Sequence, residues 1–185
     1  MVYLFLANGF EETEALCPLD LLRRAGVEVI TVGIGSEVIR GSHGITVHAD
    51  IPDIMYRDAS PDMIILPGGM PGAKNLDQSK TVDVAIKTAS KKGAYIAAIC
   101  ASPFVLGKRG LLDGKDATCF PGFEDELHGA NIITDRGVVV DGNMITARGM
   151  GVAQKFGLTL VSLLCGDEVA KNIEKSIQTE PYTND

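Results

Sequence analysis

Short apolar runs alternate with helical stretches along this chain, and this alternation constrains its fold more than any other feature. Runs that are almost entirely apolar are typical of parallel strands covered by helices on both faces. We expect such strands at 2–7, 27–33, 63–66 and 95–99, a weaker one at 45–49, and helices at 12–25, 80–92, 102–109 and 152–165. The pattern predicts an α/β fold with a mostly parallel sheet.

The segment 138–146 contains two apolar runs separated by Asp141-Gly142-Asn143. A turn containing glycine between two such runs predicts a β-hairpin, which we place at the edge of the sheet. The final residues, 178–185, are polar and lack periodicity, so we expect a loosely ordered tail. The length favours a single domain over residues 1–185.

The charge balance is acidic, with 24 Asp and Glu residues against 17 Lys and Arg residues. This excess argues against general nucleic-acid binding, which needs basic residues to neutralise phosphates. We find neither a basic stretch before the first apolar run nor an apolar segment that could cross a bilayer, and we expect a cytoplasmic protein with no membrane association. No metal-binding cysteine pair or nucleotide-binding glycine pattern is found, so no cofactor is expected.

Cys100 lies where an apolar strand runs directly into a helix, which is the layout of a nucleophile elbow. The sharp turn requires small residues two positions before and after the nucleophile, and Ala98 and Ser102 satisfy this requirement. The start of the following helix would favour a thiolate. A buried structural cysteine is the alternative, and this segment alone leaves both interpretations open.

Three acidic residues, Glu11, Glu12 and Glu14, surround the junction between the first strand and the first helix. Acids in a first turn often only cap the helix, and that explanation suffices for Glu11 and Glu12. In an open parallel sheet, however, ligands bind beyond the carboxyl ends of the strands, so one acid could face Cys100. On a helix that begins near Glu12, Glu11 and Glu14 share a face that Glu12 does not.

Gly68 and Gly69 also follow an apolar strand, where their N–H groups could approach an oxyanion. An ordinary Gly-Pro turn explains this segment equally simply. His43, His48 and His128 are the available partners for a Cys-His pair, and the sequence does not show which of them reaches the site.

Segments 9–14, 66–69, 97–103 and 148–149, taken together and in this order, resemble the DJ-1/ThiJ/PfpI superfamily, specifically its DJ-1/YajL branch. The resemblance implies a flavodoxin-like three-layer sandwich and a homodimer. It also implies that Cys100 is the reactive cysteine and that a protonated Glu14 carboxyl hydrogen-bonds its thiolate. Gly68, Gly69 and Ala101 would lend backbone donors.

Two functions follow from the resemblance. In the first, Cys100 attacks a reactive carbonyl such as methylglyoxal or its early adducts, in glyoxalase III or deglycase chemistry that yields a hydroxy acid. In the second, Cys100 is oxidised to sulfinic acid in a stress sensor or chaperone. Ala101 stands where the protease-like branches have His, which argues against a protease, and Phe120 replaces a His found in some relatives.

The first helix has apolar residues almost all the way round, more than one core-facing stripe needs. We expect this surplus to contribute to the homodimer, with Leu21 and Leu22 at the interface. The alternative is a helix wholly buried within one subunit. Pro18 should distort or restart the helix.

Overall fold

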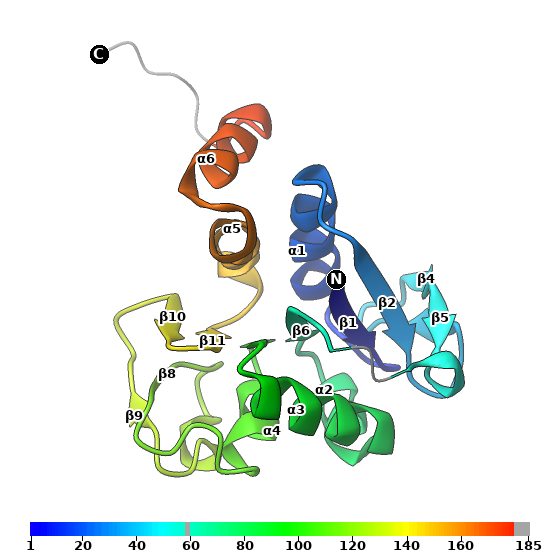
Figure 1. Ribbon diagram of the computed structural model, residues 1–185. Coiled ribbons are helices and arrows are strands. Elements are labelled where there is room, and N and C mark those ends of the chain that lie inside the picture. The colour runs from blue at the N-terminus through cyan, green and yellow to red at the C-terminus, as the bar shows by residue number, and fades with distance from the viewer. Residues whose placement is uncertain (58–59, 180–185) are drawn as a thin grey trace.

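The protein, described here from a computed structural model covering residues 1–57 and 60–179, is built around a central seven-stranded sheet (Figure 1). The strand order is β10-β11-β7-β6-β1-β2-β5. Every neighbouring pair is parallel except β10 and β11, which form the edge hairpin predicted from the turn at 141–143. The predicted α/β class is confirmed.

The strands follow the apolar runs closely. Those of the central sheet are β1 (Val2–Leu6), β2 (Val29–Gly33), β5 (Ile51–Pro52), β6 (Met63–Leu66), β7 (Tyr95–Ile99), β10 (Val138–Asp141) and β11 (Met144–Ala147). Two small pairs lie outside the sheet, formed by β3 (Val38–Arg40) with β4 (Thr46–His48) and by β8 (Asp116–Ala117) with β9 (Asn131–Ile132). The weak strand expected at 45–49 therefore exists, but it pairs only with β3.

Helices cover both faces of the sheet, as the apolar strands require. The α-helices are α1 (Glu12–Arg24), α2 (Gly72–Gln78), α3 (Lys80–Lys92), α4 (Pro103–Gly107), α5 (Ala153–Cys165) and α6 (Asp167–Ser176). Figure 1 shows α1, α5 and α6 on one side and α2, α3 and α4 on the other. Successive residues of β1 alternate between the two cores, with Leu4 and Leu6 facing α1 and α5 and with Tyr3 and Phe5 in the opposite core.

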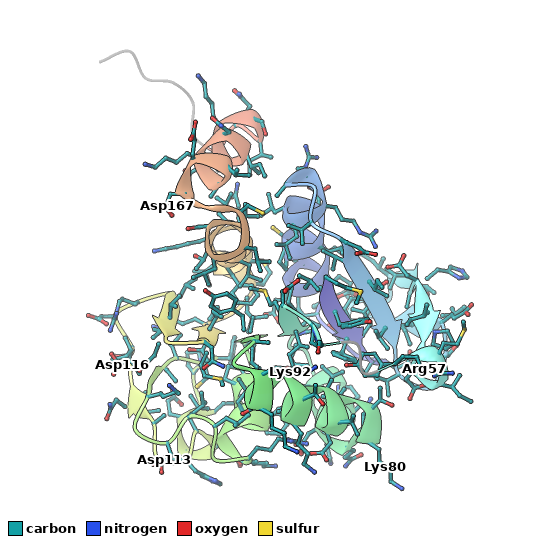
Figure 2. All side chains as sticks on the ribbon, in the orientation of Figure 1. Arg57, Lys80, Lys92, Asp113, Asp116 and Asp167 are labelled. Carbon is teal, nitrogen blue, oxygen red and sulfur yellow. The ribbon has the colours of Figure 1, made fainter. Side chains whose placement is uncertain are left out.

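Side chains fill the layers between helices and sheet, while charged residues such as Lys80 extend outward (Figure 2). Single turns of 3₁₀-helix at Asp53–Met55, Glu124–Glu126 and Met150–Val152 occur in the connections. In the described part of the chain, no helix is both long enough and apolar enough to span a membrane. Of the tail expected at 178–185, residues 180–185 lie outside the described residues.

Helices α1 and α5 pack closely because Gly157 has no side chain. A Cβ added at Gly157 would lie 2.6 Å from Leu21 Cδ1 and 2.9 Å from Pro18 Cα. Leu21 and Leu22 are buried within the subunit, so the expectation that they lie at a dimer interface is wrong. Pro18 does not interrupt α1, which is a single helix from Glu12 to Arg24.

Candidate active site

Cys100 occupies the turn between β7 and α4, and its backbone adopts a left-handed conformation with φ of 65°. Few residues other than glycine adopt this conformation, which costs about 1–3 kcal/mol unless neighbours hold it in place. Two hydrogen bonds do so. The Cys100 N–H donates to the Ala147 carbonyl at 2.8 Å, and the Cys100 carbonyl accepts from the Phe120 N–H at 2.8 Å.

Glu14 lies in the first turn of α1 with only 1% of its surface exposed. Its carboxyl is hydrogen-bonded to the Cys100 thiol and also accepts the backbone N–H groups of Gly68, at 3.0 Å, and Met150. Three segments far apart in the sequence therefore hold this carboxyl against the sulfur. The structure brings Glu14, rather than Glu11 or Glu12, to Cys100.

Burial raises the pKa of the Glu14 carboxyl to about 7, and the nearby charge of Glu11 contributes to the rise. Burial and the negative charge of Glu14 likewise raise the pKa of the Cys100 thiol to about 12. Two adjacent anions repel each other, so the pair holds both protons below about pH 7 and keeps one of them above it. Above that pH the pair is a monoanion, with its proton either on sulfur or on the carboxyl oxygen.

The backbone donors divide between the two members of this pair. The N–H groups of Gly69 and Ala101 point at the Cys100 sulfur and favour its charged form. The Gly68 N–H donates to Glu14, so it positions the acid rather than the sulfur. Helix α4 has only five residues and begins at Pro103, and its expected lowering of the thiol pKa is outweighed by burial and by Glu14.

Glu11 and Glu12 serve the surrounding loops. Glu11 is the N-cap of α1 and accepts the Glu14 N–H at 2.7 Å. Glu12 accepts the N–H of His43 at 2.8 Å, and its other oxygen lies 2.9 Å from His43 Nδ1. The hydrogen bond to Glu12 raises the pKa of His43. Ligand atoms of these three residues lie within 4.8 Å of one another, a spacing that could hold a metal, but the hydrogen bonds of Glu12 already make it a cap for the loop.

The two remaining histidines lie at the surface. His48 is on β4 and His128 follows the 3₁₀ turn at Glu124–Glu126, and both are exposed. Cys119 is buried, and its burial raises the pKa of its thiol to about 11. Cys17 is in α1 and Cys165 ends α5, and both are partly buried. All four cysteines are free thiols.

Comparison with known proteins assigns the chain to a family. The family model described as DJ-1/PfpI matches residues 1–163. The chain belongs to the DJ-1/PfpI family. It is 35% identical over 174 residues to protein dj-1beta of Drosophila melanogaster, covering 93% of each chain. It is also 33% identical over 167 residues to a protein of Pyrococcus abyssi named a deglycase, covering 88% of this chain and 98% of that one.

Solved structures of DJ-1 proteins share the fold over nearly the whole chain. A mutant of a DJ-1 superfamily protein from Salmonella typhimurium superposes with a TM-score of 0.91 at 32% identity, covering 97% of this chain and 98% of that one. Oxidised DJ-1 of Toxoplasma gondii gives 0.89 at 36% identity, with 95% and 96% covered. The sequence resemblance to this family is thereby confirmed.

Within this DJ-1/PfpI fold, two residues of the site were not predicted from the sequence. Met150 supplies an N–H to Glu14, and Phe120 supplies an N–H to Cys100. Gly149 lies beside both, since a Cβ there would be 3.7 Å from Glu14 Oε1 and 3.9 Å from Cys100 Sγ. The Arg148-Gly149 pair was part of the resemblance, but nothing in its residue types indicates contact with a thiol.

Proposed function

We propose that this protein is a cysteine-dependent enzyme that acts on small reactive carbonyl compounds, including methylglyoxal and its early adducts. The main support for this proposal is the hydrogen-bonded pair of Cys100 and Glu14. A nucleophile needs a neighbouring base, and a buried carboxyl with a pKa of about 7 is suited to accept and return protons near neutral pH.

With methylglyoxal, the sulfur of Cys100 would bond to the aldehyde carbon, and the single proton of the pair would neutralise the new oxyanion. The N–H groups of Gly69 and Ala101 point to the sulfur, where they can stabilise that oxyanion. Glu14 would then move the proton from the former aldehyde carbon to the adjacent carbon, which gives a hydroxy thioester. Water hydrolyses the thioester to lactate and restores the thiol. The sum adds one water and needs no external oxidant or cofactor.

The family relationship supports this chemistry. The Pyrococcus abyssi relative is named a deglycase, and it aligns over 88% of this chain. A deglycase removes carbonyl adducts from amines or thiols, a reaction that also begins with attack on an electrophilic carbon. The shared requirement is an activated nucleophile beside a proton carrier.

Lactate release from methylglyoxal tests the proposal. We expect turnover by the wild-type protein, loss in Cys100→Ser, and retention in the matched control Cys165→Ser, which changes a partly buried thiol at the end of α5. Turnover that survives in Cys100→Ser would refute the proposal.

A second candidate function is an oxidation sensor, favoured by the same hydrogen bond. A sulfinate on Cys100 would accept a hydrogen bond from protonated Glu14, which stabilises that oxidation state. The Toxoplasma gondii structure is of an oxidised DJ-1. Mass spectrometry after limited peroxide treatment tests this function. Preferential gain of two oxygens at Cys100 supports it, and oxidation spread evenly over the four cysteines opposes it.

A further inference from the structure

Phe120 is an exposed aromatic residue whose backbone is hydrogen-bonded to that of Cys100. Its backbone N–H is bonded to the Cys100 carbonyl at 2.8 Å. A Cβ placed on Gly149 would lie 3.3 Å from Phe120 Cδ2 and 3.9 Å from Cys100 Sγ. The phenyl ring and the sulfur therefore lie close to the same position beside Gly149, which is buried and too tight for an added group.

The ring is exposed although its backbone is anchored. Phe120 is 47% exposed, whereas most phenylalanines of this protein are fully or largely buried. The segment behind it is braced, because the Phe123 N–H donates to the Phe120 carbonyl at 3.1 Å and Phe123 stacks on Phe104 at 6.3 Å. An accessible ring on an anchored backbone offers a surface on which a flat apolar group can stack.

The charges nearest the sulfur are carboxylic. Glu14 is hydrogen-bonded to the thiol, and Glu11 lies close enough to raise the pKa of Glu14. Carboxyl groups at this position disfavour the approach of an anionic substrate. The surroundings of Cys100 thus combine an aromatic wall with local negative charge.

We propose that Phe120 determines specificity at this site by stacking on an aromatic substituent of the substrate. This inference rests on the proposed function and adds a preference, within its substrate class, for uncharged α-oxoaldehydes with an aryl group, such as phenylglyoxal. The aldehyde carbon would reach Cys100 Sγ while the aryl ring stacks on the exposed side of the Phe120 ring. Addition of one water to phenylglyoxal by the same steps gives mandelate.

Alkylation of Cys100 tests the stacking of an aryl group on Phe120 without requiring turnover. Iodoacetamide and iodoacetanilide carry the same reactive carbon, but only the second carries a phenyl ring. We expect the rate ratio of iodoacetanilide to iodoacetamide at Cys100 to fall roughly two- to tenfold in Phe120→Ala, the range of an aromatic pair. Phe120→Leu, which keeps an apolar side chain, should lower the ratio too, whereas Ile132→Ala, at another partly exposed apolar residue, should not.

Turnover provides the second readout. The ratio of kcat/KM for phenylglyoxal to that for methylglyoxal should fall in Phe120→Ala by a similar factor. Unchanged alkylation and turnover ratios in both Phe120 variants would overturn the inference. If no aldehyde is turned over but the alkylation ratio still depends on Phe120, the proposed function fails and the aromatic selectivity of the thiol site stands.

Discussion

The proton shared by Cys100 and Glu14 sets the behaviour of the site at the scale of single residues. Below the raised Glu14 pKa of about 7, both groups are protonated, and the pair has no nucleophilic form. Above it, the pair becomes a monoanion. We therefore expect the rate of Cys100 alkylation by iodoacetamide to rise through pH 7 and then level off.

In Glu14→Gln, the neutral amide cannot accept the thiol proton, so the inflection near pH 7 should disappear. Loss of this proton transfer should lower turnover by about 10²–10⁴-fold. Stopped-flow alkylation across pH 5.5–9 checks the profile, and an unaltered inflection in the variant would show that another group titrates.

Gly68 is the residue whose replacement should most directly separate the pair. An added Cβ would lie 2.5 Å from Cys100 Cβ and 2.6 Å from Glu14 Oε2, so both side chains must shift. We expect Gly68→Ala to slow Cys100 alkylation at least about tenfold and to cost about 1–3 kcal/mol of unfolding free energy. Gly151→Ala is the control, because its added Cβ meets no atom within 4 Å. Equal alkylation rates in the two variants would contradict the expectation.

Part of this site could be predicted from residue types alone. The small residues Ala98 and Ser102 indicated the nucleophile elbow. Helical spacing excluded Glu12 as the acid that faces Cys100, but the choice of Glu14 over Glu11 came from the family resemblance. Phe120 was identified only as a departure from relatives. Its contact with Cys100 depends on a chain reversal that no local pattern encodes.

At the scale of elements, the apolar strands were predictable because burial on both faces leaves a continuous apolar run. Helices α2 and α6 were missed. Helix α2 begins beside Pro71 and Gly72, which read as a turn, and α6 is mostly polar and buries only Ala170 and Ile173. The helix expected at 102–109 is shorter, ending at Gly107, where a Cβ would meet the Glu126 carbonyl at 2.3 Å.

The packing of α1 on α5 should be sensitive to a single methyl group. Alanine has a higher helix propensity than glycine by about 1 kcal/mol, yet a Cβ at 157 would press on Leu21 and Pro18. We expect the steric cost to exceed the gain, so that Gly157→Ala lowers the unfolding free energy by about 1–3 kcal/mol. Urea unfolding beside Gly151→Ala measures this, and a stabilised Gly157→Ala would show that the helices can separate at little cost.

At the scale of the whole molecule, we propose a homodimer through α1, but with a different contact residue. Leu16 is only partly buried and belongs to neither core cluster, unlike Leu21 and Leu22. We expect sedimentation at micromolar concentration to give twice the chain mass of 19.6 kDa, and Leu16→Lys to give the single mass with its fold intact. A single mass for the wild-type protein at all concentrations would exclude the dimer.

The two hydrogen bonds that hold the Cys100 backbone have a consequence for biosynthesis. A ribosome completes Cys100 before it makes Phe120, whose N–H donates one of those bonds, and Ala147, whose carbonyl accepts the other. Until β11 docks beside β7, nothing provided by those two residues offsets the left-handed strain at Cys100. We therefore expect a nascent chain to carry an ordinary cysteine at this position, with the strained, acid-paired thiol forming only after the last strand of the sheet has been translated and folded.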